Sequence, residues 1–249
     1  MPGTSLDEDL AFGGVTFDGK GHVVSTAMMS VGAGPWSSFE DSFKSRLAVA
    51  LQKADANSHI QGWRANDIRE RLDTFLERGL PAQFESLSSN EEMTIIHADF
   101  SLSSLLYDPT TRRIIALLDY DFACILHLSY EFLRSFDGAG GQFRGWSGNE
   151  DTEELALREA ELHGFPSPLP ESTEDEIQWE DALEEARVKR PRAITGIDKA
   201  ADVDAILRMI LPWRLNNEDI LGMQSEEVIV KYRAQCEKQL GKMLERLGF

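Results

Sequence analysis

The most distinctive chemical pattern in this 249-residue sequence is a histidine followed by acidic residues at the ends of two apolar segments. His97 and Asp99 come directly after a short β-branched segment. Asp119 and Asp121 come directly after a second apolar segment. If both segments are strands, they deliver carboxylates to neighbouring loop positions. Such a geometry suits a divalent cation or a pair of groups that transfer a proton.

Three short strands must position these residues. The segments Thr94 to Ile96, Ser104 to Tyr107 and Ile114 to Leu118 contain the β-branched and apolar residues that are typical of strands. Asp108-Pro109-Thr110 has the composition of a turn and separates the second segment from the third. We therefore expect a small central β element within residues 93–123.

The residues around these carboxylates resemble those of a known family. The aminoglycoside phosphotransferase and choline kinase-like family, especially its fungal members, has motifs similar to His97-Ala98-Asp99, Leu105-Leu106-Tyr107-Asp108-Pro109 and Leu117-Leu118-Asp119-Tyr120-Asp121-Phe122-Ala123. The resemblance implies a protein-kinase-like fold, a small-molecule substrate, and Mg²⁺ and ATP as cofactors. It also implies that Asp99 is the catalytic base, that Asp119 binds Mg²⁺, and that His97 braces the catalytic loop.

The same resemblance assigns three further positions. Ser104 stands where the family has an asparagine that binds the metal and contacts the cofactor, and a hydroxyl is a poorer oxygen ligand than an amide carbonyl. Asp121 has either a direct role in catalysis or a structural hydrogen bond to the catalytic loop. Glu131 matches the acidic residue that braces this loop.

The resemblance covers only the C-terminal lobe of the family fold. Family members have an N-terminal lobe with a phosphate-covering loop, a lysine and its glutamate partner, whereas residues 10–36 of this chain resemble the hinge that follows that lobe. We therefore expect a truncated member with a degenerate active site. The chain keeps the acceptor-side aspartate but has no recognisable clamp for the nucleotide, which argues against ATP-dependent phosphoryl transfer by this chain alone.

Three functional hypotheses follow from these residues. The first is a small-molecule phosphotransferase whose acceptor pocket is built on Asp99 and Asp119. The second is a kinase-derived enzyme of secondary metabolism that catalyses a cyclisation, isomerisation or elimination on a natural product. In that enzyme a partly buried carboxylate of Asp99, Asp119 or Asp121 would donate or accept the proton. The third is a catalytically inactive binding module, and the retained aspartates favour an enzyme over it.

The composition limits the classes of partner and the location. A net charge of −18 argues against binding nucleic acid or an anionic membrane, and it favours cationic or neutral small ligands. Cys124 and Cys236 lack a C-x-x-C spacing and lie in apolar surroundings, so we expect reduced, buried thiols. No segment approaches the roughly 20 apolar residues of a membrane span, and the N-terminus lacks the basic residues of a secretion signal. These features predict a cytoplasmic protein.

The remaining pattern predicts a single α+β domain, mainly α, over residues 10–249 after a disordered start at 1–9. Within residues 10–36, Gly14 to Phe17 and His22 to Thr26 form a hairpin around an Asp-Gly turn, and a second copy of the chain would cover it in a homodimer. Residues 37–92 are expected to be helical, 93–123 to carry the catalytic and metal-binding motifs, and 124–249 to be helical.

Caps and periodicity predict the individual helices. Ser37 or Ser38 would cap the first helix, and Asn66 would cap a second helix that ends at Gly79. The later helices are expected over residues 155–162, 174–188, 197–211 and 225–247. On the last of them, the apolar positions form one stripe of Val228, Tyr232, Cys236, Leu240, Met243 and Leu247.

Overall fold

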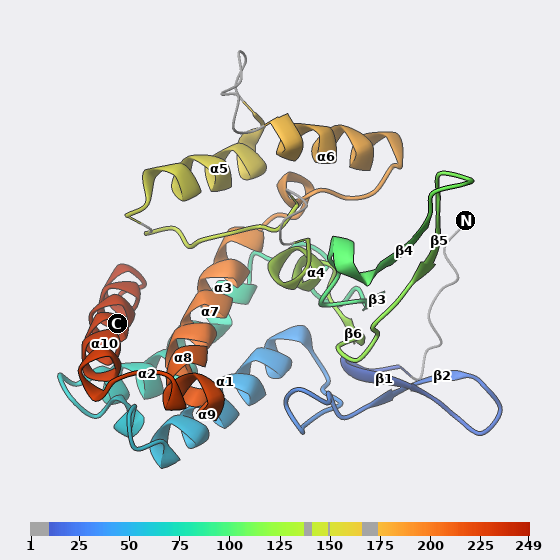
Figure 1. Cartoon of the computed structure of the whole chain (residues 1–249). Coiled ribbons are helices and arrows are strands. Elements are labelled where there is room, and N and C mark those ends of the chain that lie inside the picture. The colour runs from blue at the N-terminus through green and yellow to red at the C-terminus, as the bar shows by residue number, and fades with distance from the viewer. Residues whose placement is uncertain (1–9, 137–140, 149, 166–173) are drawn as a thin grey trace.

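A computed structural model describes residues 10–136, 141–148, 150–165 and 174–249 (Figure 1). The segment 1–9, expected to be disordered, lies outside the described residues. The described chain is mixed α/β and mainly helical, as the sequence predicts, with two small antiparallel sheets.

The larger sheet positions the first part of the candidate site, the loop that contains His97 and Asp99. Its four strands are antiparallel in the order β2-β1-β6-β3, with β1 at Gly13–Phe17, β2 at Val23–Thr26, β6 at Cys124–Leu126 and β3 at Thr94–Ile96. The predicted hairpin is therefore present, and Asp18 closes its turn by accepting the backbone N–H groups of Lys20 and His22. Strand β6 was not predicted, because a three-residue apolar segment gives no periodicity to detect.

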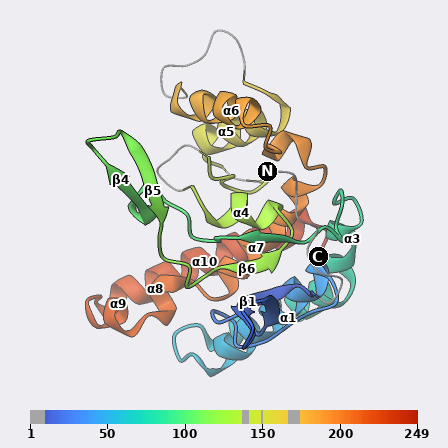
Figure 2. The same cartoon turned by 90° about the vertical axis from the view of Figure 1, so that its right-hand side faces the viewer.

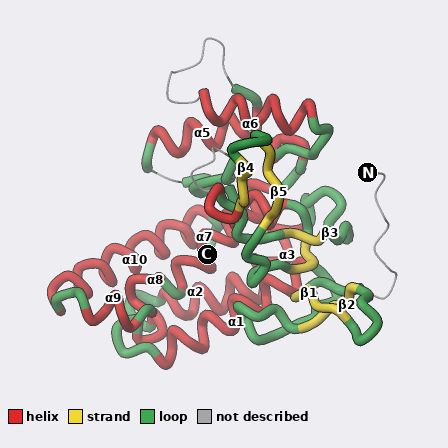
Figure 3. The backbone as a smooth tube through the Cα atoms, turned by 45° about the vertical axis from the view of Figure 1, so that its right-hand side comes forward, coloured by secondary structure: helices red, strands yellow, loops and turns green. Residues whose placement is uncertain are grey.

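The second sheet is a two-stranded ribbon, and the second part of the candidate site, Asp119 and Asp121, follows its last strand. Strand β4 (Leu105–Asp108) pairs with β5 (Arg113–Leu117) around the predicted turn, where Asp108 accepts hydrogen bonds from Thr110 and Thr111. The ribbon projects from the body of the molecule (Figures 1 and 2). Strands lie along one side of the fold and helices fill the other (Figure 3).

The helices of the first half follow the predicted caps only in part. Helix α1 (Phe39–Ala56) begins at Ser38, whose hydroxyl accepts the N–H of Asp41. Helix α2 (Ile68–Thr74) begins after Asp67, not Asn66, and Asp67 provides no side-chain cap. The predicted end at Gly79 is wrong, because a π-turn over Phe75–Gly79 continues directly into α3 (Leu80–Phe84).

The second half is helical, as predicted. It comprises α4 (Ser129–Arg134), α5 (Thr152–His163), α6 (Glu174–Glu185), α7 (Ile197–Ile210), α8 (Trp213–Asn216), α9 (Glu218–Gly222) and α10 (Glu226–Arg246). On α10 the predicted stripe is wrong at its start, since Val228 is exposed and Ile229 is buried instead. Among the described residues, no helix combines the length and the apolar character that crossing a membrane requires.

Helix α7 is the centre of the packing. It contacts α1, α3, α4 and α10, and its buried residues belong to the same apolar cluster as those of α1 and of β6. Helices α5 and α6 form a separate layer beyond α4 (Figure 1). Cys124 and Cys236 lie in this cluster as free, buried thiols, which confirms the prediction for both.

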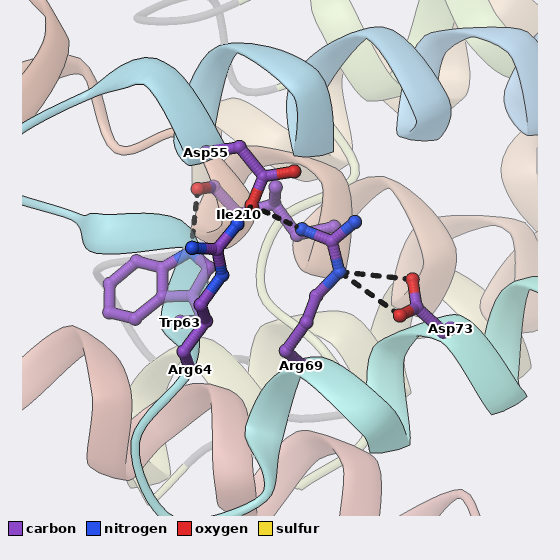
Figure 4. Close-up of polar contacts among 6 residues, drawn as sticks. All are labelled: Asp55, Trp63, Arg64, Arg69, Asp73 and Ile210. Atoms are coloured by element: carbon purple, nitrogen blue, oxygen red, sulfur yellow. Dashed lines mark hydrogen bonds and ion pairs between the residues drawn. The ribbon is translucent and has the colours of Figure 1, made fainter.

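A polar network fixes the end of α1 against α2 and α7 (Figure 4). The indole N–H of Trp63, which is fully buried, donates to the carbonyl of Ile210 at 2.8 Å. Arg69 forms ion pairs with Asp55 of α1 at 2.7 Å and with Asp73 of α2 at 3.0 Å. The Trp63 bond satisfies one of the carbonyls that the C-terminus of a helix leaves without an intrahelical partner.

We expect Trp63→Phe to lower the free energy of unfolding by about 1–3 kcal/mol, because it leaves the buried Ile210 carbonyl without its donor. Chemical denaturation monitored by circular dichroism would measure the change. Trp213→Phe is the matched control, since Trp213 is exposed and its replacement should stay within about 0.5 kcal/mol of the wild type. Equal effects of the two substitutions would contradict the role of the Trp63 bond.

Candidate functional site

The carboxylate of Glu131 holds the loop that follows β3. Its two oxygens accept the backbone N–H of His97 at 2.7 Å and that of Ala98 at 3.2 Å. Ala98 has a left-handed backbone, with φ of 61°, which is unusual for a residue with a side chain. Glu131 on α4 therefore braces the His97–Asp99 loop, as the sequence predicts.

Ser135 extends this brace toward Phe100. Its hydroxyl donates to the same carboxylate of Glu131 and accepts the backbone N–H of Phe100 at 2.9 Å. Sequence reasoning missed Ser135. The available signal was its position four residues after Glu131, a spacing that brings two side chains together on one face of a helix.

His97 connects the two halves of the site. Its Nε2–H donates to the carbonyl of Leu118 at 2.8 Å, and the N–H of Leu118 in turn donates to the carbonyl of Ser104, also at 2.8 Å. Asp119 follows Leu118 directly. Backbone and side-chain bonds thus bring the loop after β3, the start of β4 and the end of β5 together, although these strands belong to two different sheets.

The candidate carboxylates lie at the surface of this junction. The side chains of Asp99, Asp119 and Asp121 are exposed, and within the described residues they form no hydrogen bond or ion pair. Within the part of the chain that the structure describes, Asp121 therefore makes no side-chain bond to the loop after β3. None of the three is the partly buried carboxylate that the hypothesis of a non-phosphoryl acid–base enzyme calls for.

The donor set around Asp119 fits Mg²⁺ in its chemistry. Asp99 and Asp119 supply free carboxylates, and the buried hydroxyl of Ser104 lies 3.4 Å from the carbonyl of Asp99. Mg²⁺ prefers oxygen ligands, and it usually keeps several waters, so one or two carboxylates are sufficient. Across the described parts of the chain, no group of three or more histidine, cysteine or acidic residues is arranged to hold a metal by itself.

Exposed apolar side chains are numerous on the β4–β5 ribbon and on the loops that carry the carboxylates. More than 40% of the surface of each is accessible in the set Leu102, Leu106, Tyr107, Ile114, Ile115, Leu118, Tyr120 and Phe122. The ring of Tyr120 also lies over that of His97, with 5.2 Å between the ring centroids. The acidic groups therefore lie in a part of the chain that is rich in exposed apolar side chains.

Burial disfavours the reactive form of the nearby thiol of Cys124. Cys124 on β6 is fully buried beneath the site, and this burial raises the pKa of the thiol to about 12. The thiolate is the reactive form of cysteine, so the candidate chemistry rests on the aspartates.

The family model described as the phosphotransferase enzyme family (APH) matches residues 31–162, which is more than half of the chain. The chain belongs to this family. The matched range contains the Glu131 brace, the His97 link and all three exposed aspartates, so the whole candidate site lies in the region that identifies it as a phosphotransferase-family protein. Neither the curated proteins nor the solved structures include a match to this chain.

We expect Ser135→Ala to loosen the loop after β3, because it leaves the N–H of Phe100 without its acceptor and removes one donor from Glu131. Hydrogen exchange would show faster exchange of the Phe100 amide, and the free energy of unfolding should fall by about 1–3 kcal/mol. Ser103→Ala is the control, because among the described residues this exposed hydroxyl bonds only to Ser101. Unchanged exchange at Phe100 would show that Ser135 does not hold the loop.

Proposed function

We propose that this phosphotransferase-family protein transfers a phosphoryl group from Mg·ATP to a hydroxyl of a small molecule, although its sequence shows no recognisable clamp for the nucleotide, because the family match includes both the acceptor-side and the metal-side aspartates. The observation that carries the proposal is the bonded junction of His97, Leu118 and Ser104, which brings two unpaired carboxylates to neighbouring positions on the surface. Asp99 is the proposed acceptor-side group and Asp119 the proposed metal-side group. Both lie in the region that matches the family.

The protein's own part in the reaction is positioning and proton transfer. As the acceptor oxygen forms a bond to the γ-phosphorus, the bond from this phosphorus to the β,γ-bridging oxygen breaks and ADP leaves. The carboxylate of Asp99 accepts the proton that the acceptor hydroxyl loses. Phosphoryl transfer depends on positioning and on charge stabilisation, which is why the rigid brace on the loop of Asp99 matters for the rate.

Asp119 and the hydroxyl of Ser104 are the proposed holders of Mg²⁺. The ion supplies positive charge that offsets the charge on the phosphates. Asp119 is suited to this role because its side chain is exposed and unpaired, so that no ion pair in the described chain has to break first. The hydrogen bond from the N–H of Leu118 to the carbonyl of Ser104 holds together the backbone segments from which the two side chains extend.

The structure favours this function over the acid–base alternative. A carboxylate that donates or accepts a proton in a cyclisation or elimination works best when its environment shifts its proton affinity, and burial is the usual means. The three aspartates are exposed. Phosphoryl transfer requires no buried carboxylate, and exposed oxygens are accessible to a hydrated cation.

Titration calorimetry with Mg²⁺ and ATP tests the nucleotide and metal side of the proposal. We expect saturable binding to the wild-type chain and at least about tenfold weaker binding to Asp119→Asn, because an amide lacks the negative charge that attracts the cation. Asp219→Asn is the control, since Asp219 is an exposed aspartate on α9. A wild-type chain that shows no binding at millimolar ATP would contradict phosphoryl transfer and leave the acid–base enzyme and the binding module.

Turnover tests the role of Asp99. We expect Asp99→Asn to bind Mg·ATP as the wild type does while its transfer rate falls by about 10²–10⁴-fold, the usual contribution of a general base. A screen of small-molecule alcohols, followed by ADP release, would supply the acceptor for this measurement. Full activity of Asp99→Asn on any acceptor would remove Asp99 from the mechanism.

A further inference from the structure

We propose that a cavity between α1, α4 and α7 is a binding site for a small oxyanion, a phosphate or carboxylate group. The cavity has a volume of about 270 Å³ and is bounded by these helices and by the loop after β2 at Ser30 and Val31. Helix α7 packs on both α1 and α4 (Figure 1). None of the aspartates of the candidate active site lines it.

The charge of the cavity is opposite to that of the protein. Its lining includes the four cations Arg46, Lys53, Arg134 and Arg208, and a single carboxylate, that of Asp204. This composition leaves a local charge of +3 in a chain whose net charge is −18. Positive side chains that converge on one concave surface raise the local concentration of anions.

The negative charge of Asp204 repels an anion in the cavity only in part. Asp204 is almost completely buried, and its carboxylate forms an ion pair of 2.6 Å with the guanidinium of Arg208. For Arg46, Lys53 and Arg134, the described residues provide no salt bridge. These three cations around the cavity therefore have no ion-pair partner among the described carboxylates.

Arg46 gives the strongest indication of a ligand. Its side chain is only 5% exposed, and its Nη2 is buried without a hydrogen-bond partner. The one hydrogen bond that the guanidinium makes within the described chain runs from Nε to the carbonyl of Ser42, at 3.3 Å. A buried charge is costly unless it is paired and hydrogen-bonded, so an arginine in this state calls for an anion.

Aromatic rings hold the Arg46 guanidinium in place. Its Cζ lies 3.9 Å from the ring centroid of Phe43 and 4.6 Å from that of Tyr130. The two rings, whose planes are 85° apart, restrict the position of the guanidinium, and its N–H groups are able to donate two parallel bonds to a carboxylate or phosphate. The side chain is thus preorganised for an oxyanion, whereas Lys53 and Arg134 at the exposed rim supply less directional charge.

The cavity shares α4 with the candidate active site. Tyr130 and Arg134 face the cavity from the helix that carries Glu131, the residue that braces the catalytic loop. The pKa of Arg134 is raised chiefly by Tyr130, and the charges of Asp204 and Asp99 act in the same direction. A ligand in the cavity therefore contacts the helix that braces the loop of Asp99, and the argument for this site does not depend on the phosphotransfer proposal.

Calorimetric titration of the full chain with inorganic phosphate, methyl phosphate, acetate and succinate, without Mg²⁺ or ATP and at constant ionic strength, tests the site. We expect saturable binding to one site. Binding of the two phosphates would identify a phosphate group as the ligand chemistry, and binding of the two carboxylates would identify a carboxylate. No saturable binding of any of the four would overturn the proposal.

Matched variants locate the binding. Lys53→Gln and Arg134→Gln should each weaken it by about tenfold, the loss typical of one charge-assisted hydrogen bond, and Arg46→Gln should abolish it. Lys44→Gln is the control, because Lys44 is an exposed lysine of α1 that does not line the cavity. Equal weakening in Lys44→Gln, or unchanged binding in Lys53→Gln and Arg134→Gln, would overturn the site.

Two further variants keep the test decisive. If Arg46→Gln fails to fold, Arg46→Lys retains the charge but loses the planar fork, and it should still weaken binding. Asp119→Asn should bind the anion as the wild type does, because Asp119 lies outside the cavity. Loss of anion binding in Asp119→Asn would place the anion at the candidate active site instead and so overturn the proposal.

Discussion

One carboxylate, which accepts three hydrogen bonds, organises the candidate site. Glu131 receives the N–H groups of His97 and Ala98 and the hydroxyl of Ser135. Backbone N–H groups that are withdrawn from water need partners, and a charged acceptor forms stronger bonds than a neutral one. Without Glu131 the loop after β3 would have to satisfy these groups elsewhere, and its backbone would be free to change.

The need for this brace follows from the backbone of the site. Ala98 and Asp119 both have positive φ, at 61° and 63°, a conformation that costs an L-residue of order 1–3 kcal/mol. The bonds of Glu131 flank the first of these residues, and the bond from His97 to Leu118 precedes the second. The tertiary contacts hold both turns in a conformation that the local sequence does not favour, and the two loops that carry the exposed Asp99 and Asp119 are joined through His97 and Leu118.

Local signals explain what the sequence could predict. The Asp-Gly turn, the Ser38 cap and the apolar face of α1 are determined by residues close together in the chain, and each is present. Strand β6 and the continuation of α2 through Gly79 depend on pairing and packing with distant segments, and both were missed. In the site, the family-type motif predicted Glu131 as the brace, while the Ser135 bond and the exposure of the aspartates depend on how distant segments pack together.

The cationic cavity shows why overall charge is a poor guide to ligands. A net charge of −18 favours cationic or neutral ligands when only the sequence is considered. Arg46 sits on the buried face of α1, one turn from Phe43, at a position where the pattern alone would expect an apolar residue. Charges separated by more than about 10 Å are largely screened in salt, so the remote carboxylates of this chain contribute little to the cavity. What an anion meets there is decided by the unpaired guanidinium and its neighbours, because these act at close range and partly out of water.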